Sequence, residues 1–133
     1  MNKNNLYLVG DLQYYAIPYV SLYVNRIEDK LYIAIRISDY DNPVRNYILA
    51  ETNPEIILAY MNNKIHLSSI VIHSPKIFLW QVNTNTGMDI TKKMNKDEAL
   101  SHISSDDEFD KDFCDEESTI NYYLRYKPDL EFA

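Results

Sequence analysis

The densest set of groups that could do chemistry is a run of carboxylates near the C-terminal end of the chain. Five acids fall at positions 1, 3, 5, 7 and 12 of the calcium-binding EF-hand loop: Asp106, Glu108, Asp110, Asp112 and Glu117. Lys111 occupies the sixth position, where that loop needs Gly for its sharp turn. We therefore expect a solvated acidic face here and predict no metal site.

Asp11, followed later by Glu28-Asp29-Lys30, has the composition of a metal-dependent nuclease motif. In such a motif two carboxylates hold Mg²⁺ and a Lys stabilises the charge that develops. The Glu-x-Lys part should lie in a core strand, whereas residues 25–30 have the polar composition of a hairpin turn. Exposed turn charges are the expectation.

The remaining side chains with catalytic potential do not form familiar patterns. The histidines lack the i, i+4 or i, i+2 spacing that would direct two rings at one metal: His66, His73 and His102. Acids flank Cys114 and disfavour its thiolate, so we expect a packing or bystander residue. Two glycines cannot build a phosphate-binding loop. The sequence predicts no catalytic residue and no cofactor.

The net charge is concentrated in one part of the chain. Residues 1–95 contain 9 Lys/Arg and 8 Asp/Glu, a formal +1, whereas residues 96–133 contain 4 and 12, a formal −8, which together give the −7 of the whole chain. Phosphate backbones repel such a surface, so we expect no direct nucleic-acid binding and a partner protein with a basic surface. The residues predicted to bind it are Asp106, Asp107, Glu108, Asp110, Asp112, Tyr122 and Tyr123.

Tyrosines and arginines support an alternative. Adjacent strand residues point to opposite faces, so one member of each Tyr pair is expected at the surface, where Tyr suits an interface. A small nucleotide-like ligand could instead be held by Arg gripping phosphate and Tyr stacking on a base. The candidate residues for that ligand site are Arg36, Arg45, Tyr14 and Tyr15.

Short apolar and aromatic runs predict the strands that position these groups. They cover residues 6–9, 19–24, 31–37, 46–50 and 76–82, with turns over 25–30, 38–43 and 83–87. Residues 31–37 alternate as a half-buried strand does, which places their odd positions toward the core. Gly87 supplies the positive φ angle that a tight turn can require. An antiparallel meander is the expected sheet.

Helix signals are fewer. Pro54 after a Thr-Asn cap predicts a helix over 52–61, and residues 96–103 predict another. Residues 65–73 fit neither period. The Ser105-Asp-Asp-Glu108 capping box predicts a helix over 106–117, with a mobile acidic loop as the alternative. Strand character returns over 119–126.

The chain is expected to form one α+β domain over residues 1–133, mainly antiparallel sheet with one to three short helices. Within it we distinguish a near-neutral strand-rich body (1–95), an acidic helical or loop segment (96–118) and a C-terminal strand and tail (119–133). No run approaches the roughly 20 apolar residues of a membrane span. The start lacks the apolar core of a secretory signal. These features predict a cytoplasmic protein that does not bind membranes.

Four short segments share an apolar spacing: GDLQYYAIP at 10–18, LYIAI at 31–35, YIL at 47–49 and IHLSSI at 65–70. Over about residues 5–75 this pattern resembles the opening of uncharacterised small domains in bacterial and phage proteins. The resemblance implies an accessory protein of bacterial or phage origin and carries no catalytic residues.

The expected function is that of a non-enzymatic binding protein, such as an inhibitor, immunity or anti-defence factor, whose acidic surface meets a basic partner. A small-ligand sequestering protein and an enzyme with an unrecognised active site are the alternatives. Exposed strand edges would also allow a homo-oligomer.

Overall fold

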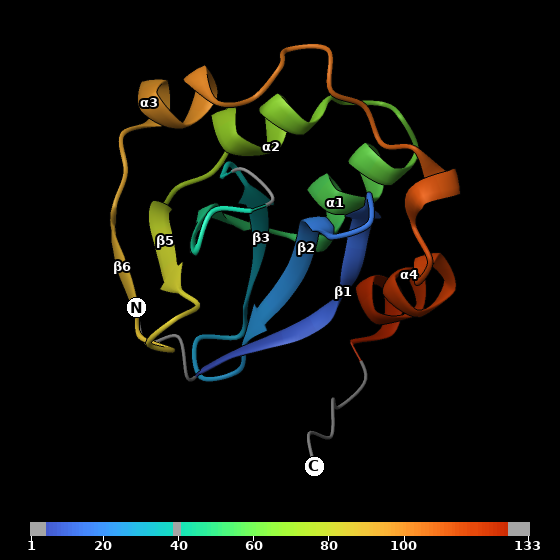
Figure 1. Ribbon diagram of the computed structural model, residues 1–133. Coiled ribbons are helices and arrows are strands. Elements are labelled where there is room, and N and C mark those ends of the chain that lie inside the picture. The colour runs from blue at the N-terminus through green and yellow to red at the C-terminus, as the bar shows by residue number, and fades with distance from the viewer. Residues whose placement is uncertain (1–4, 39–40, 128–133) are drawn as a thin grey trace.

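A computed structural model describes residues 5–38 and 41–127, in which six antiparallel strands form one sheet and short helices pack beside it (Figure 1). The strands neighbour one another in chain order. They are β1 (Leu6–Tyr14), β2 (Pro18–Asn25), β3 (Lys30–Arg36), β4 (Val44–Thr52), β5 (Ile77–Asn83) and β6 (Asp89–Lys93). The predicted α+β domain with an antiparallel meander is confirmed.

Local side-chain hydrogen bonds make the hairpin turns. The Asn25 Oδ1 atom accepts hydrogen bonds from the N–H groups of Ile27 and Glu28, each at 3.1 Å. In the β5–β6 hairpin Asn83 caps the turn in the same way, and Gly87 adopts the predicted positive φ, at 72°. The turns predicted over 25–30 and 83–87 are confirmed. Part of the loop predicted over 38–43, residues 39–40, lies outside the described residues.

Strand β3 is buried on both faces. Its odd positions enter the core between the sheet and the helices, as the alternation predicts. The even positions are also buried, with Tyr32 only 1% and Ala34 2% exposed, so the strand is not half-buried as expected. Half-buried side chains on the second face of the sheet cover them: Leu6, Tyr23, Tyr47, Phe78 and Trp80.

Helix α1 (Pro54–Met61) follows β4 and has the predicted start. Asn53 Oδ1 accepts the Ile56 N–H at 3.0 Å, and Pro54 takes the first helical position. The segment without a clear period forms α2 (Leu67–Ile72), which buries residues at i, i+3 and i+4: Leu67, Ile70 and Val71. Helix α3 (Lys96–Ser101) confirms the helix predicted over 96–103.

The C-terminal prediction is wrong, because residues 119–126 belong to helix α4 (Glu117–Tyr126) rather than to a strand. The helical spacing of Ile120, Tyr123 and Leu124 buries all three on one side, while Tyr122 and Tyr126 face outward. Packing of that apolar stripe overrides the strand preference of Ile and Tyr. Of the predicted tail, residues 128–133 lie outside the described residues.

Helix α4 lies over β1 (Figure 1). Gly10 permits this contact, since a Cβ atom there would collide with the Glu116 Oε2 atom and lie 2.9 Å from the Ile120 Cγ1 atom.

The helix predicted over 106–117 is also wrong, because only η2 (Lys111–Phe113), a single 3₁₀ turn, forms within it. The described residues contain four short α-helices, one more than the upper end of the expected range of one to three. None of them has the length and apolar character that crossing a membrane requires.

Candidate functional site

The acidic segment, residues 105–117, connects α3 to α4 along an irregular path. In Figure 1 it is the orange chain that passes the ends of α2 and α1 and reaches the edge of the sheet at β1. Asp106, Glu108, Asp110 and Asp112 are exposed along it, and Asp107 is partly buried. The segment is therefore neither the helix that its capping box predicts nor a chain without fixed contacts.

Buried groups hold the first half of the segment. Phe109 is buried and packs edge-to-face on Tyr60, with ring centroids 5.4 Å apart. The Leu67 N–H donates to the Asp107 carbonyl at 2.8 Å, and the Tyr19 hydroxyl donates to Asp107 Oδ2, also at 2.8 Å. Burial, reinforced by that hydrogen bond, raises the pKa of Tyr19, which keeps its hydroxyl a donor. Asp107 thus contributes to the fold as well as to the surface charge.

Gln13 of β1 explains why residues 106–117 do not form a helix. Its side chain is fully buried, its Nε2 donates to the Asp110 carbonyl, and its Oε1 accepts the Asp110 N–H, both at 2.9 Å. Both backbone groups of Asp110 are therefore bonded to β1, and its carbonyl also accepts the Phe113 N–H at 3.1 Å in the 3₁₀ turn η2. Two tertiary hydrogen bonds and the burial of Phe109 outweigh a local helix preference of a few tenths of a kcal/mol per residue.

Cys114 anchors the second half. The residue is buried, and its Sγ lies 3.7 Å from the Asp11 carbonyl oxygen. Burial raises the pKa of the Cys114 thiol to about 11, and the neighbouring carboxylates add to that effect. A neutral, buried thiol agrees with the packing role expected from the sequence.

Two exposed aromatic rings lie beside the carboxylates. Tyr15 is 43% and Phe113 42% exposed, and their ring centroids are 4.6 Å apart. Burial and the nearby charges of Asp107 and Asp110 raise the pKa of Tyr15. We call this set the acidic–aromatic surface: Tyr15, Asp106, Glu108, Asp110, Asp112 and Phe113. It brings Tyr15, predicted for a small-ligand site, together with the predicted partner-binding acids.

The other residues predicted for the small-ligand site lie elsewhere. Arg36 is buried, with its Nε 3.4 Å from the Ser38 carbonyl, and is paired with Tyr47 across β3 and β4. Arg45 is exposed and opposite Val82, whereas Tyr14 ends β1. Neither arginine lines a described cavity with a tyrosine. The structure does not assemble these four residues into one site.

Tyr122 and Tyr123, predicted for the partner surface, separate on α4. Tyr122 is exposed, and its ring pairs with that of Tyr126 at 5.0 Å. Tyr123 is 6% exposed and forms part of a cavity wall. Burial is the main cause of its raised pKa, and Asp29 adds to it.

The residues of the nuclease-like motif and the histidines lie in separate parts of the structure. Asp11 accepts a hydrogen bond from the Ser21 hydroxyl at 2.7 Å within the β1–β2 ladder, whereas Glu28 lies in the β2–β3 turn and accepts one from Asn25. His66 contacts Glu108, with Nε2 3.3 Å from Oε1, and His73 pairs with the Ser69 carbonyl. Over residues 5–38 and 41–127, no three His, Cys, Asp or Glu side chains are grouped to hold a metal.

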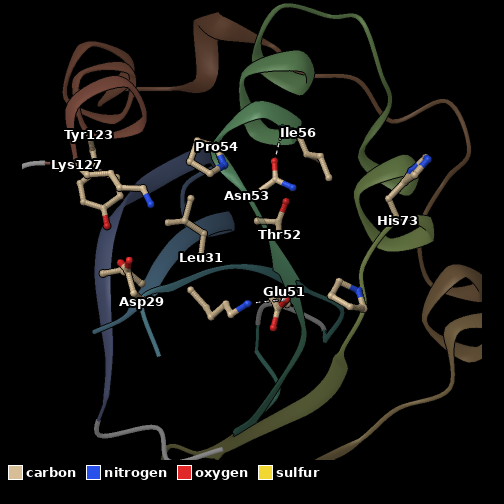
Figure 2. A pocket seen from close by; sticks show the side chains of 13 residues that line it. Asp29, Leu31, Glu51, Thr52, Asn53, Pro54, Ile56, His73, Tyr123 and Lys127 are labelled. Carbon is tan, nitrogen blue, oxygen red and sulfur yellow. Dashed lines mark hydrogen bonds and ion pairs between the residues drawn. The ribbon is translucent and has the colours of Figure 1, made fainter. Parts of the chain in front are cut away.

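A cavity of about 290 Å³ lies where the β2–β3 turn, the end of β4, the start of α1 and the end of α4 meet. Figure 2 shows Leu31 and Thr52 in the middle of its wall, with Asp29 and Lys127 on one side and Glu51 below. Lys30 Nζ is 3.9 Å from Glu51 Oε2. Two cations and two carboxylates thus line the cavity, and their formal charges sum to zero.

Thr52 is the unusual residue of this cavity. It is 8% exposed, and its Oγ1 has no hydrogen-bond partner among the described residues. Sequence reasoning did not single it out, because nothing in an isolated Thr indicates an unpaired hydroxyl.

Comparison with protein-family models, curated proteins and solved structures finds no match to this chain.

Proposed function

We propose that the protein is a non-enzymatic binding protein whose acidic–aromatic surface recognises a basic surface of a partner protein. One observation supports this above the others. Buried, mostly uncharged groups fix the backbone of the acidic segment. Its carboxylates are therefore held in defined positions near the exposed rings of Tyr15 and Phe113. A pre-arranged surface loses less conformational entropy on binding than a free acidic chain would.

The chemistry of this surface suits Lys and Arg side chains. Carboxylates attract the cations and can accept charge-assisted hydrogen bonds, while Tyr15 and Phe113 offer ring faces for cation–π contact. A factor of the inhibitor, immunity or anti-defence type would act in this way by occupying a basic functional surface of its target. Such an interaction should weaken as the salt concentration rises.

The test neutralises three exposed acids: Asp106→Asn, Glu108→Gln and Asp112→Asn. Of these, Glu108 contacts His66, whose side chain is itself exposed. A matched control removes three exposed acids elsewhere: Asp41→Asn, Glu55→Gln and Glu98→Gln. Both variants change the net charge by +3. An isotope-labelled sample is titrated with a decalysine peptide over a salt series and followed by NMR.

We expect shifts centred on residues 105–117 and on Tyr15, and about tenfold weaker binding for the first variant only, at roughly 0.5 kcal/mol for each lost contact. Equal weakening in both variants would show that net charge alone governs binding. That result, or shifts spread evenly over the protein, would contradict the proposed surface.

The Thr52 cavity supports a second candidate function, the binding of a small ligand. A buried hydroxyl without a partner costs about 1–3 kcal/mol, which a ligand hydrogen bond would recover after rotation about χ1. Because the wall charges cancel, a compact ligand with both charge signs, such as an amino acid, suits the cavity better than a nucleotide.

Thr52→Val tests this candidate, since it removes the hydroxyl and keeps the shape. The unliganded variant should melt at a higher temperature than the wild type. In a thermal-shift panel of amino acids and nucleotides, any stabilisation of the wild type by a zwitterion should shrink in the variant. A panel in which no zwitterion stabilises the wild type would exclude this candidate and leave the partner-protein proposal unaffected.

A further inference from the structure

The four charged residues of the Thr52 cavity differ in whether they already have a partner. Lys30 and Glu51 pair with each other, with Nζ 3.9 Å from Oε2. Asp29 and Lys127 lie on the same side of the cavity in Figure 2, and neither side chain forms a hydrogen bond or ion pair with another described residue. One carboxylate and one ammonium group are therefore available together on that side.

Left-handed backbone geometry places these two side chains. Asp29 has a φ angle of 53° in the turn between β2 and β3, and Lys127 has one of 43° at the end of α4. Both residues sit where the chain reverses or leaves its element, at the exposed rim of the cavity. Two elements that are far apart in the sequence thus bring opposite charges to one side of the same cavity.

The inner part of the cavity is apolar except for one hydroxyl. Val24 and Leu31 are buried and Ile56 is half-buried, and we call these three residues the apolar wall. Thr52 pairs with Leu31 across the β3–β4 ladder and adds the buried Oγ1 that has no partner among the described residues. The volume of about 290 Å³ lies at the lower limit for small-molecule sites, about 300–1,000 Å³, so a ligand must be small.

We propose that the cavity selects an α-amino acid with an aliphatic side chain, an inference that rests on the second candidate function above. In such a molecule the ammonium and carboxylate groups are attached to one carbon atom, so both must find their partners on the same side. Asp29 accepts hydrogen bonds from the ammonium group, and Lys127 donates to the carboxylate. The Thr52 hydroxyl donates to that carboxylate as well, and the aliphatic side chain packs on the apolar wall.

Two other classes of zwitterion fit less well. An amino acid with its ammonium group at the far end of a carbon chain needs available partners on two sides, whereas Lys30 and Glu51 already pair with each other. An amino acid with a charged side chain would bring a third charge against the apolar wall, where no described group could pair with it. The arrangement of charges therefore separates leucine-like molecules from both classes.

The experiment is an NMR titration of the isotope-labelled full chain with L-leucine and three related compounds. 4-Methylpentanoic acid lacks only the ammonium group of leucine, and 3-methylbutan-1-amine lacks only its carboxylate. 6-Aminohexanoic acid keeps both charges but separates them by five carbon atoms. We expect L-leucine to shift the amides of Asp29, Thr52 and Lys127 and to bind about tenfold or more tightly than each of the other three.

Three variants assign the two charges of the ligand to their partners. Asp29→Asn, which tolerates the left-handed backbone, and Lys127→Gln should each weaken L-leucine binding about tenfold or more. Lys30→Gln is the matched control, because it makes the same charge change as Lys127→Gln at a cation that is already paired, and it should alter binding by less than about twofold. Asp29→Asn should leave the binding of 4-methylpentanoic acid within about a factor of two, since that compound lacks the group that Asp29 contacts. Circular dichroism checks that each variant is folded.

The outcomes separate this inference from the function on which it rests. Tighter binding of 6-aminohexanoic acid than of L-leucine would overturn the preference for α-amino acids and leave the small-ligand candidate standing. L-Leucine binding that is unchanged in both Asp29→Asn and Lys127→Gln would overturn the assignment of the two charges. If neither zwitterion binds the wild type in the Thr52 cavity, the inference fails, and a wider panel without any zwitterion hit removes the candidate function too.

Discussion

Replacing Gln13 with Met should release the acidic segment from β1 without changing any charge. Met keeps nearly the volume and the flexibility of Gln, so the buried position stays filled. What is lost is the pair of 2.9 Å hydrogen bonds to the N–H and the carbonyl of Asp110 and a 3.2 Å bond from the Tyr15 hydroxyl. Asp110 is exposed, so water can replace part of this loss.

At about 1 kcal/mol for each of the two backbone bonds, the free energy of unfolding should fall by roughly 2 kcal/mol. For a chain of this size that corresponds to a melting temperature lower by about 5–10 °C. The local effect should be larger than the global one. Hydrogen exchange at the Asp110 amide should accelerate well beyond the change in global stability, because the segment can then open on its own.

The matched control is Gln81→Met. Gln81 also donates a side-chain hydrogen bond, to Asn46 Oδ1 at 2.8 Å, but it lies on β5, away from the acidic segment. We expect a smaller loss of stability and unchanged exchange at Asp110. The reasoning is refuted if Gln13→Met leaves the exchange of the Asp110 amide as slow as in the wild type, or if both variants accelerate it equally.

Three other outcomes follow from the described contacts. Gly10→Ala should lower the free energy of unfolding in urea titrations by about 1–3 kcal/mol, because the new Cβ atom meets Glu116 and Ile120. Gly87→Ala should lower it by only about 1 kcal/mol, because the positive φ angle strains Ala there but no atom is close enough to clash. Equal losses would contradict this account. In the native protein near pH 8, the Cys114 thiol should react with a disulfide reagent at least a hundredfold more slowly than in the unfolded chain, which follows from its thiolate fraction alone. Burial raises the pKa of Cys114 from 9.0 to about 11 and that of Tyr23 from 10.0 to about 12. The folded protein favours the neutral form of both groups, so their contribution to the free energy of unfolding is fully present below pH 9 and is lost as the pH rises toward 12. Urea midpoints that stay constant over that window would refute the shifts.

The sheet could be predicted from the sequence because its signals are local. Apolar alternation marks β3, and Asn25 and Gly87 mark the turns beside it and after β5. The short strand β6 could not be found in this way, since Asp-Ile-Thr-Lys-Lys has a single apolar residue. It forms because the tight turn before it returns the chain alongside β5, which supplies the ladder.

Residues 106–126 were misjudged for two different reasons. For α4 the signal was present, since Ile120, Tyr123 and Leu124 have helical spacing, but the β preference of the residue types was given more weight. For residues 106–117 the deciding interaction is distant. Gln13 lies 97 positions from Asp110, and no local pattern indicates that the two will bond. The acids of the predicted site were found by composition, whereas Phe113 was not linked to Tyr15 because their contact is tertiary.

The acidic segment separates the groups that carry charge from the groups that hold it in place. Its most exposed carboxylates make few contacts with the core, whereas Phe109, Cys114 and Gln13 fix its path and carry no charge. Neutralising the acids therefore changes the charge and keeps the path, and Gln13→Met changes the path and keeps the charge. If both changes weaken the binding of a basic peptide, recognition depends on the arrangement of the carboxylates. If only neutralisation weakens it, the segment acts as a diffuse negative field, and docking against β1 serves the fold alone.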